Sequence, residues 1–330
     1  MSVHTLVHPS QTTAPLLEVE RLGVSFGPAE VVRDISFSVA AGETLCLVGE
    51  SGSGKSMTAL ATLRLTPPGS RVQADRIVLN GIDLAELSEE GIRKIRGKQC
   101  AMIFQEPMTS LNPVLRIGDQ VAEPLLEHER ISREDALERA VLALKQVGIP
   151  AAAQRMKDYP HQLSGGMRQR VMIAMALICE PRLLLADEPT TALDVTIQGQ
   201  ILNLLRTQTH ERGMGLVLIT HDLNVVAETS DHVGVMYAGR IVEYAPVAEL
   251  FARPLHPYTQ GLMGAAPSRT GRGERLATIA GTVPSPLQYP TGCAFAPRCP
   301  KAVDACAHED PEERTVGPGH SLRCLLYHEK

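Results

Sequence analysis

The stretch Gly49-Glu-Ser-Gly-Ser-Gly-Lys-Ser56 matches the phosphate-loop pattern G-x-x-x-x-G-K-[S/T] at every fixed position. The apolar run 44–48 precedes it, and residues 57–63 after it have helical apolar spacing. A glycine-rich turn between a buried strand and a helix points backbone N–H groups at an anion. An ordinary Gly/Ser-rich surface turn would not need this context. The stretch therefore predicts an α/β fold with a phosphate site.

The residues of this loop have separate expected roles. Lys55 should reach the β- and γ-phosphates of a nucleotide, and the Ser56 hydroxyl should ligate Mg²⁺. The glycines allow the tight turn that aims the N–H groups inward. The whole predicted contact set is Gly49, Glu50, Ser51, Gly52, Ser53, Gly54, Lys55, Ser56 and Met57.

An acidic pair, Asp187 and Glu188, follows the apolar run 183–186. We expect this run to be a strand that delivers Asp187 to the magnesium ion. Glu188 can then polarise the attacking water. Taken alone, two acids at a strand end are equally typical of a solvated terminus. The phosphate loop favours the functional interpretation.

Three more residues are expected at the same site. Gln105 follows the predicted strand 100–104, where its amide oxygen could touch Mg²⁺ or water. His221 follows the predicted strand 216–220 and could contact the γ-phosphate and Glu188. Ligands of doubly wound sheets bind at the carboxyl ends of the strands, although a lone histidine is more often structural. Asp194 lies just beyond Glu188.

A second glycine-rich element begins at Ser164. Ser164 can cap a helix whose first turn contains Gly165 and Gly166, with Val171 and Ala174 on its apolar face. An ordinary capped helix does not explain two glycines that weaken its first turn. They leave the N–H groups of the helix start open to a phosphate. The chain thus contains two predicted anion sites.

These motifs, in this order, resemble the nucleotide-binding subunits of ABC transporters. The resemblance implies a P-loop NTPase core, a RecA-like lobe with a mixed sheet, together with a helical lobe. It implies that Ser164, Gly165 and Gly166 close on ATP held by a second subunit, and that Asp194 lies at that nucleotide site. Phe26 matches the aromatic residue that stacks on adenine.

Four segments resemble one branch, the dipeptide and oligopeptide permease ATPases of the DppD and OppD type. They are residues 104–113, 159–170, 256–258 and 292–300, and the whole resemblance runs from about residue 17 to about residue 325. The branch also contains importers of nickel and other small solutes, so the solute stays open.

The resemblance to this branch also implies partners. They are two transmembrane permease subunits, a second and paralogous ATPase, and indirectly an extracytoplasmic solute-binding protein. The chain would lie at the cytoplasmic face of the cell membrane. Residues 106–120 and the helical lobe would receive a coupling helix, although a plain surface loop is the alternative.

The amino-acid composition argues against several other classes of protein. The net charge is −5, aromatic residues make up 3% and Trp is absent, so nothing suggests a nucleic-acid partner. No apolar run reaches the ~18–20 residues of a membrane span, and no signal peptide is visible. A soluble ABC ATPase acting on DNA or ribosomes is the runner-up. It would usually carry a long coiled-coil insertion or two fused nucleotide domains, and neither is visible.

The expected organisation has three parts. Residues 1–16 form a disordered leader, and residues 17–250 form the nucleotide-binding domain. Within that domain, 17–105 and 181–250 form the core and 106–180 form the helical lobe, including a helix capped by Ser132. Residues 251–330 form a small C-terminal extension that carries a cysteine cluster.

Four of the seven cysteines lie in that extension: Cys293, Cys299, Cys306 and Cys324. Disulfides are disfavoured in a cytosolic ATPase. Structural zinc usually uses C-x₂₋₄-C pairs, whereas the gaps here are five, six and seventeen residues. An iron–sulfur cluster tolerates irregular spacing. The family resemblance implies a [4Fe–4S] cluster, with Zn²⁺ or no metal as alternatives. A non-enzymatic metal sensor is a further alternative, which intact Lys55, Glu188 and His221 argue against.

The remaining cysteines have a different expected role. Cys46, Cys100 and Cys179 lie in apolar stretches and are predicted to be small core residues.

Overall fold

The computed structural model describes residues 14–105, 110–191, 193–265 and 279–327. Most of the expected leader, residues 1–13, lies outside this range. Leu16, the last residue of the expected leader 1–16, contradicts the expected boundary between leader and core. Leu16 is only 6% exposed, and its N–H donates to the carbonyl of Val39 at 2.8 Å. The ordered core therefore begins at least one residue earlier than expected.

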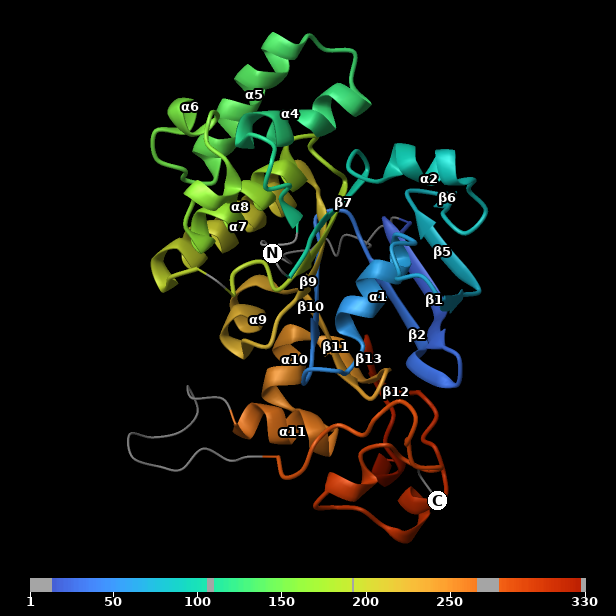
Figure 1. Cartoon of the computed structure of the whole chain (residues 1–330). Helices are drawn as coiled ribbons and strands as arrows, with labels where there is room; N and C mark the ends of the chain where they lie inside the picture. Colours follow the sequence, from blue (N-terminus) through green and yellow to red (C-terminus); the bar gives the residue numbers. More distant parts are fainter. Residues whose placement is uncertain (1–13, 106–109, 192, 266–278, 328–330) are drawn as a thin grey trace, which may run out of the picture.

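The larger sheet has the strand order β12-β13-β11-β10-β3-β9-β8-β7 (Figure 1). The five strands from β10 to β7 run parallel, and β11 to β13 are antiparallel, which confirms a mixed sheet. The parallel strands β3, β8 and β9 are buried along their whole length, as expected for strands covered on both faces. The bounds are β3 Thr44–Val48, β7 Cys100–Ile103, β8 Leu183–Asp187, β9 Gly215–Ile219, β10 His232–Tyr237, β11 Arg240–Pro246, β12 Arg314–Gly317 and β13 His320–Leu322.

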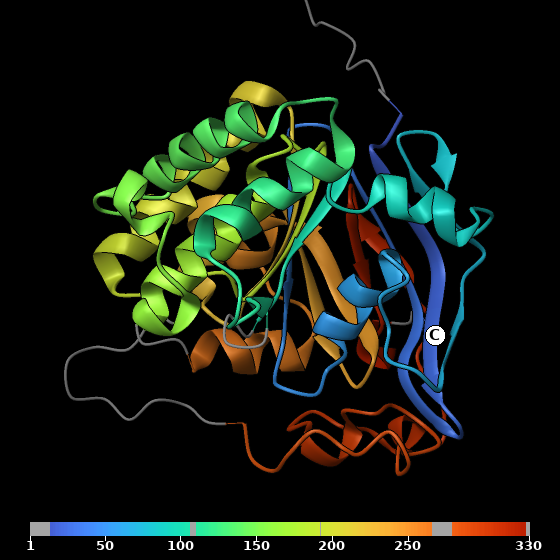
Figure 2. The same ribbon diagram turned by 45° about the horizontal axis from the view of Figure 1, so that its top comes forward.

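A second, antiparallel sheet has the order β2-β1-β5-β6, with β4 also pairing with β1. Helix α1, Lys55–Thr62, contacts β1 and β2 of this sheet and β8 of the larger one (Figure 2). This packing holds the end of the phosphate loop between the two sheets. The remaining bounds are β1 Leu17–Phe26, β2 Ala29–Val39, β4 Ser70–Gln73, β5 Arg76–Leu79, β6 Ile82–Asp83 and α2 Glu89–Ile95.

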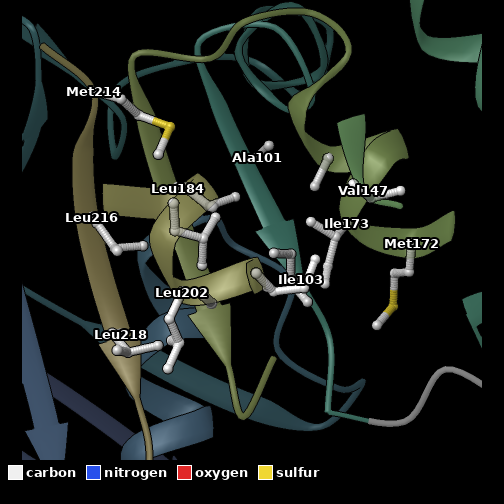
Figure 3. Packing of buried hydrophobic residues seen from close by; sticks show 14 of the residues in the cluster. Ala101, Ile103, Val147, Met172, Ile173, Leu184, Leu202, Met214, Leu216 and Leu218 are labelled. Atoms are coloured by element: carbon white, nitrogen blue, oxygen red, sulfur yellow. The ribbon is translucent and has the colours of Figure 1, made fainter. Parts of the chain in front are cut away.

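A run of helices, α4 to α7, lies between β7 and β8 in sequence, where the helical lobe is expected. Ser132 caps α5 by accepting a hydrogen bond from the N–H of Asp135, which confirms the expected helix start. Figure 3 shows Ile173 of α7 beside Ile103 of β7, within one buried cluster that also contains Ala101 and Met172. The lobe contains α4 Ile117–His128, α5 Arg133–Gln146, α6 Ala152–Arg155, η1 Pro160–Gln162 and α7 Gly165–Leu177.

The C-terminal extension is built into the core rather than appended to it. Strand β13 pairs with β11, so the extension continues the larger sheet. The buried Glu243 carboxylate of β11 accepts hydrogen bonds from the N–H groups of Leu255 and His256 at 2.8 and 2.9 Å. It also contacts Nε2 of the buried His320 at 3.0 Å. A single buried carboxylate therefore ties three segments together.

The last helices complete the fold. They are α8 Val195–Arg212, α9 Leu223–Thr229, α10 Val247–Ala252, α11 Pro257–Gly264, η3 Ala296–Arg298, η4 Asp304–Ala307 and η5 Leu325–Tyr327. Helix α10 crosses the expected boundary at residue 250. Across the described ranges, every helix is too short or too polar to traverse a bilayer.

Candidate nucleotide site

The phosphate loop joins the end of β3 to the start of α1, as the sequence predicts. Gly49 has a φ of +151°, and a Cβ there would come within 2.2 Å of the Met236 carbonyl oxygen. Gly54, the residue before α1, has a φ of +103°. Neither position tolerates a side chain without moving the backbone. The loop's path across β10 thus depends on these glycines.

Lys55 is buried, with 7% of its surface exposed. Its Nζ donates to the carbonyls of Gly49 at 2.8 Å and Glu50 at 2.9 Å. Burial lowers the pKa of Lys55, and the nearby carboxylates of Glu188 and Asp187 oppose this shift. The ammonium group therefore lies within the loop and close to both predicted acids.

Asp187 ends β8 and is 4% exposed. Burial raises the pKa of Asp187, while a hydrogen bond from the Ser56 side chain lowers it. Among the described residues, its buried Oδ1 has no hydrogen-bond partner. A buried carboxylate oxygen left unpaired beside a hydroxyl fits an oxygen-ligated divalent cation such as Mg²⁺.

Glu188 follows with a left-handed backbone, φ 47°, which is uncommon outside glycine. Its N–H donates to the carbonyl of Ile219 on β9 at 2.9 Å. Its carboxylate accepts from the Thr191 hydroxyl at 2.9 Å and lies 3.2 Å from Nδ1 of His221. Backbone and side chain are thus both held. A carboxylate fixed in this way can accept a proton from water.

Gln105 and His221 follow two parallel strands, β7 and β9, that lie on either side of β8. Strand β7 ends at Ile103 and β9 at Ile219, so both predicted strands end one residue earlier than expected. The following residues diverge from the sheet, and Phe104 is 39% exposed. The register pairs Ile103 with Ala186, so the exposed Gln105 lies past the end of β7, the strand that neighbours β8. The structure brings His221 into direct contact with Glu188.

The two remaining predicted residues, Asp194 and Phe26, lie at the start of a helix and at the end of a strand. Asp194 caps α8, because its Oδ1 accepts from the N–H of Ile197 at 3.0 Å. Phe26 is half-buried at the end of β1, next to the turn into β2. The β1–β2 unit approaches the phosphate loop, since a Cβ at Gly54 would come within 2.8 Å of the Val31 carbonyl oxygen.

Ser164 caps α7, as predicted, by accepting from the N–H of Met167 at 3.3 Å. Ser164 is exposed, and a Cβ added at Gly165 would meet no atom within 4 Å. The start of the helix is therefore open to a ligand. Both views place α7 with the helical lobe and α1 with the core (Figures 1 and 2). Farther along α7, the Gln169 amide donates to the Glu188 carbonyl at 3.3 Å.

Sequence reasoning missed several residues that contact the site. Thr191 and Gln169 hold Glu188, although neither belongs to a predicted contact. Tyr258 and Arg298 of the extension contact Glu50 of the phosphate loop. Tyr258 lies in the family segment His256-Pro-Tyr258, which was a usable signal. Nothing in the sequence pairs Arg298 with Glu50.

The extension's cysteines come from separate turns that the fold brings together. The Cys324 thiol interacts electrostatically with those of Cys293, Cys299 and Cys306. Burial raises the pKa of Cys324 to about 11. The N–H of Cys293 donates to the carbonyl of Cys306 at 2.9 Å. Within the described ranges, no three His, Cys, Asp or Glu side chains are grouped to hold one ion.

The other three cysteines are core residues, as predicted. Cys46, Cys100 and Cys179 are exposed by only 0%, 1% and 9%. Burial raises the pKa of all three thiols, which keeps them protonated.

Comparison with known proteins agrees with this geometry. Residues 32–191 match the ABC transporter family, and residues 242–306 match the C-terminal region of oligopeptide and dipeptide transporters. The oligopeptide transport ATP-binding protein AppD of Bacillus subtilis is 50% identical over 96% of this chain and 98% of its own. OppD of Escherichia coli is 48% identical over 96% and 94%.

Solved structures show the same fold. A dimeric post-hydrolysis state of the ATP-binding cassette MJ0796, bound to ADP and Pi, aligns with a TM-score of 0.64 and 27% identity. The alignment covers 70% of this chain and 98% of the MJ0796 chain. The chain belongs to the ABC transporter family, as an ATPase of the branch that contains the oligopeptide and dipeptide transport ATP-binding proteins.

Proposed function

We propose that this chain is the ATP-hydrolysing subunit of an importer for dipeptides or oligopeptides. One observation carries the proposal: the Glu188–His221 contact beside the phosphate loop and the exposed Ser164 helix cap occur on one chain with the peptide-transporter C-terminal region. The names of AppD and OppD support peptides as the solute.

Each residue of the set has a role in the proposed reaction. Lys55 binds the β- and γ-phosphates, while Glu188 orients the attacking water and accepts its proton. His221 holds Glu188 and contacts the γ-phosphate. Ser56, Asp187 and Gln105 would hold Mg²⁺, which would supply positive charge to offset the negative charge on the phosphates.

The second phosphate site serves another ATPase chain. Ser164, Gly165 and Gly166 would bind ATP held on the partner, because the open N–H groups of α7 attract anions. Asp194 fixes the start of α8 beside that junction, and Phe26 stacks on the adenine held by its own chain. ATP would then close two chains over two nucleotides, and hydrolysis would reopen them. The second ATPase is proposed to be a paralogue.

A groove of about 550 Å³ between the core and the helical lobe fits the proposed contact with a transmembrane subunit. Its lining is largely apolar and includes Leu65, Met102, Phe104, Pro124 and Met175. A short coupling helix would insert there and transmit closure to two permease subunits at the cytoplasmic face of the cell membrane. A solute-binding protein would deliver solute on the opposite side.

We further propose that Cys293, Cys299, Cys306 and Cys324 hold a [4Fe–4S] cluster. The donor chemistry supports it, because such clusters take four thiolates at irregular spacing. A zinc ion, with Zn–S bonds of about 2.3 Å, would gather the sulfurs around one point. The Cys324 thiol interacts electrostatically with the other three, which supports one shared site, and Zn²⁺ is the alternative occupant.

Uptake measurements test the solute. A host strain lacking this chain should lose uptake of labelled dipeptides and oligopeptides. The wild-type chain should restore this uptake, and Glu188→Gln should not. Normal peptide uptake combined with lost nickel uptake would assign the chain to a small-solute importer instead.

A further inference from the structure

The phosphate loop is held by the C-terminal extension through Glu50. The Arg298 guanidinium donates to both carboxylate oxygens of Glu50, Nη1 to Oε1 and Nη2 to Oε2, each at 3.0 Å. The Arg298 side chain is 6% exposed and that of Glu50 is 30% exposed. Paired hydrogen bonds from a buried guanidinium fix direction as well as distance.

Other contacts hold Arg298 itself in place. Its Nε donates to the Ala280 carbonyl at 2.8 Å, and its Nη2 also donates to the Ile279 carbonyl at 3.3 Å. The Tyr237 hydroxyl of β10 lies 3.4 Å from Nη1. The guanidinium is therefore anchored by the extension and by the core sheet before it reaches Glu50.

Tyr258 of α11 supplies a second, independent contact. The backbone N–H of Glu50 donates to the buried Tyr258 hydroxyl at 2.8 Å. The hydroxyl also interacts with the Glu50 carboxylate. Tyr258 packs against Tyr237 and Phe295, with ring centroids 4.7 and 5.3 Å away. An aromatic cluster thus fixes the oxygen that holds the loop.

Glu50 is consequently bound through all three of its polar groups. Its N–H is held by Tyr258, its carboxylate by Arg298, and its carbonyl accepts from Nζ of Lys55 at 2.9 Å. Leu262 and Ala265 of the same extension line a cavity of about 460 Å³ that is also lined by Gly49, Glu50 and His221. The extension and the phosphate loop therefore form one site.

We infer that Arg298 and Tyr258 are positioning residues for ATP binding, which hold the phosphate loop and Lys55 in their binding geometry through Glu50. This inference rests on the proposed role of Lys55 at the phosphates. Neither residue needs to touch the nucleotide. Their effect arises because a loop already held in shape loses less conformational freedom when ATP binds.

The test compares variants of the full chain by calorimetric titration with Mg²⁺ and ATP. Arg298→Gln removes both bonds to the carboxylate, and Tyr258→Phe removes only the hydroxyl. Asp310→Asn is the matched control, because Asp310 forms a 2.8 Å ion pair with Arg240 that ties the extension to β11 without involving Glu50. Melting temperatures without nucleotide separate loss of folding from loss of positioning.

Arg298→Gln should weaken ATP binding about tenfold, equivalent to about 1.4 kcal/mol. Glu50→Gln should do the same, and the double variant should be no weaker than either single one. Arg298→Lys should recover part of the affinity, because it restores one bond. Tyr258→Phe should weaken binding severalfold, and Asp310→Asn should match the wild type.

Two results would overturn the inference. One is wild-type ATP affinity in Arg298→Gln, and the other is an equal loss of affinity in Asp310→Asn, which would mean that any loosening of the extension suffices. A wild-type chain that does not bind ATP would instead remove the proposed role of the phosphate loop.

Discussion

Nδ1 of His221 lies 3.2 Å from Oε1 of Glu188, although the two residues follow different strands. Strands β8 and β9 run parallel, and their register pairs Asp187 with Ile219. Their next residues therefore leave the sheet at the same edge. Asp187, Glu188 and His221 therefore lie at the same edge of the sheet as the phosphate loop, where ligands of such sheets bind.

Glu188→Gln should lower the ATP hydrolysis rate by about 100-fold or more, because it removes the proposed proton acceptor. ATP affinity should be retained, since Lys55 is untouched, and the variant should accumulate as a closed, ATP-loaded dimer. Phosphate release and light scattering measure the two effects. Glu43→Gln is the control and should hydrolyse ATP normally. Glu43 lies away from the site, where its carboxylate is 2.6 Å from Nδ1 of His232. Normal turnover in Glu188→Gln would exclude the assigned role.

Ser164→Arg should abolish turnover in the assembled transporter and leave ATP binding to the isolated chain intact. The bulky cation would block the open start of α7, where the second chain's phosphate is proposed to bind. Ser132→Arg is the matched control, since Ser132 caps α5 of the same lobe in the same way. The account is wrong on this point if Ser164→Arg turns over normally, or if Ser132→Arg is equally inactive.

The Glu43–His232 pair predicts a pH-dependent stability. The hydrogen bond with Glu43 raises the pKa of His232 above its ordinary value of 6.5, although burial opposes the shift. Burial is the largest single effect on Glu43 and disfavours its charged carboxylate, but the hydrogen bonds with His232 and with the Ala40 N–H, together with the charge of His232, lower its pKa. The histidine contribution is complete below about pH 6.5 and is lost as pH rises through the raised pKa. The Glu43 contribution is lost as pH falls through the lowered pKa.

Thermal melts of wild type and His232→Gln between pH 5 and pH 9 measure this contribution. The difference in melting temperature should be largest near pH 5 to 6 and should shrink above about pH 7. A difference that grows with rising pH would contradict the assignment.

Replacement of a tail cysteine should remove iron. Chains purified without oxygen should carry about four irons when the proposed cluster is intact. Cys299→Ser and Cys306→Ser should lower the bound iron and the visible absorption, measured by elemental analysis and spectroscopy. Cys179→Ser, at a core position, should keep both. Stoichiometric zinc without iron in the wild type would favour the alternative ion.

Local motifs made the nucleotide site predictable from sequence. The phosphate loop, the Ser164 cap and the acidic pair each lie within a few residues, so strand, turn and helix chemistry specify them directly. The mixed sheet followed from the family resemblance. The contact between Arg298 and Glu50 spans 248 residues and has no local pattern. Strand β13, His320–Leu322, is too short for a periodic signal, so its place in the sheet depends on pairing with β11.

The most direct test of the account is purification of Glu188→Gln from native membranes in the presence of ATP, with its companions identified by mass spectrometry. The account predicts two membrane permeases and a second ATPase in fixed stoichiometry. Recovery of the chain alone, or with ribosomal or DNA-bound proteins, would contradict the importer assignment.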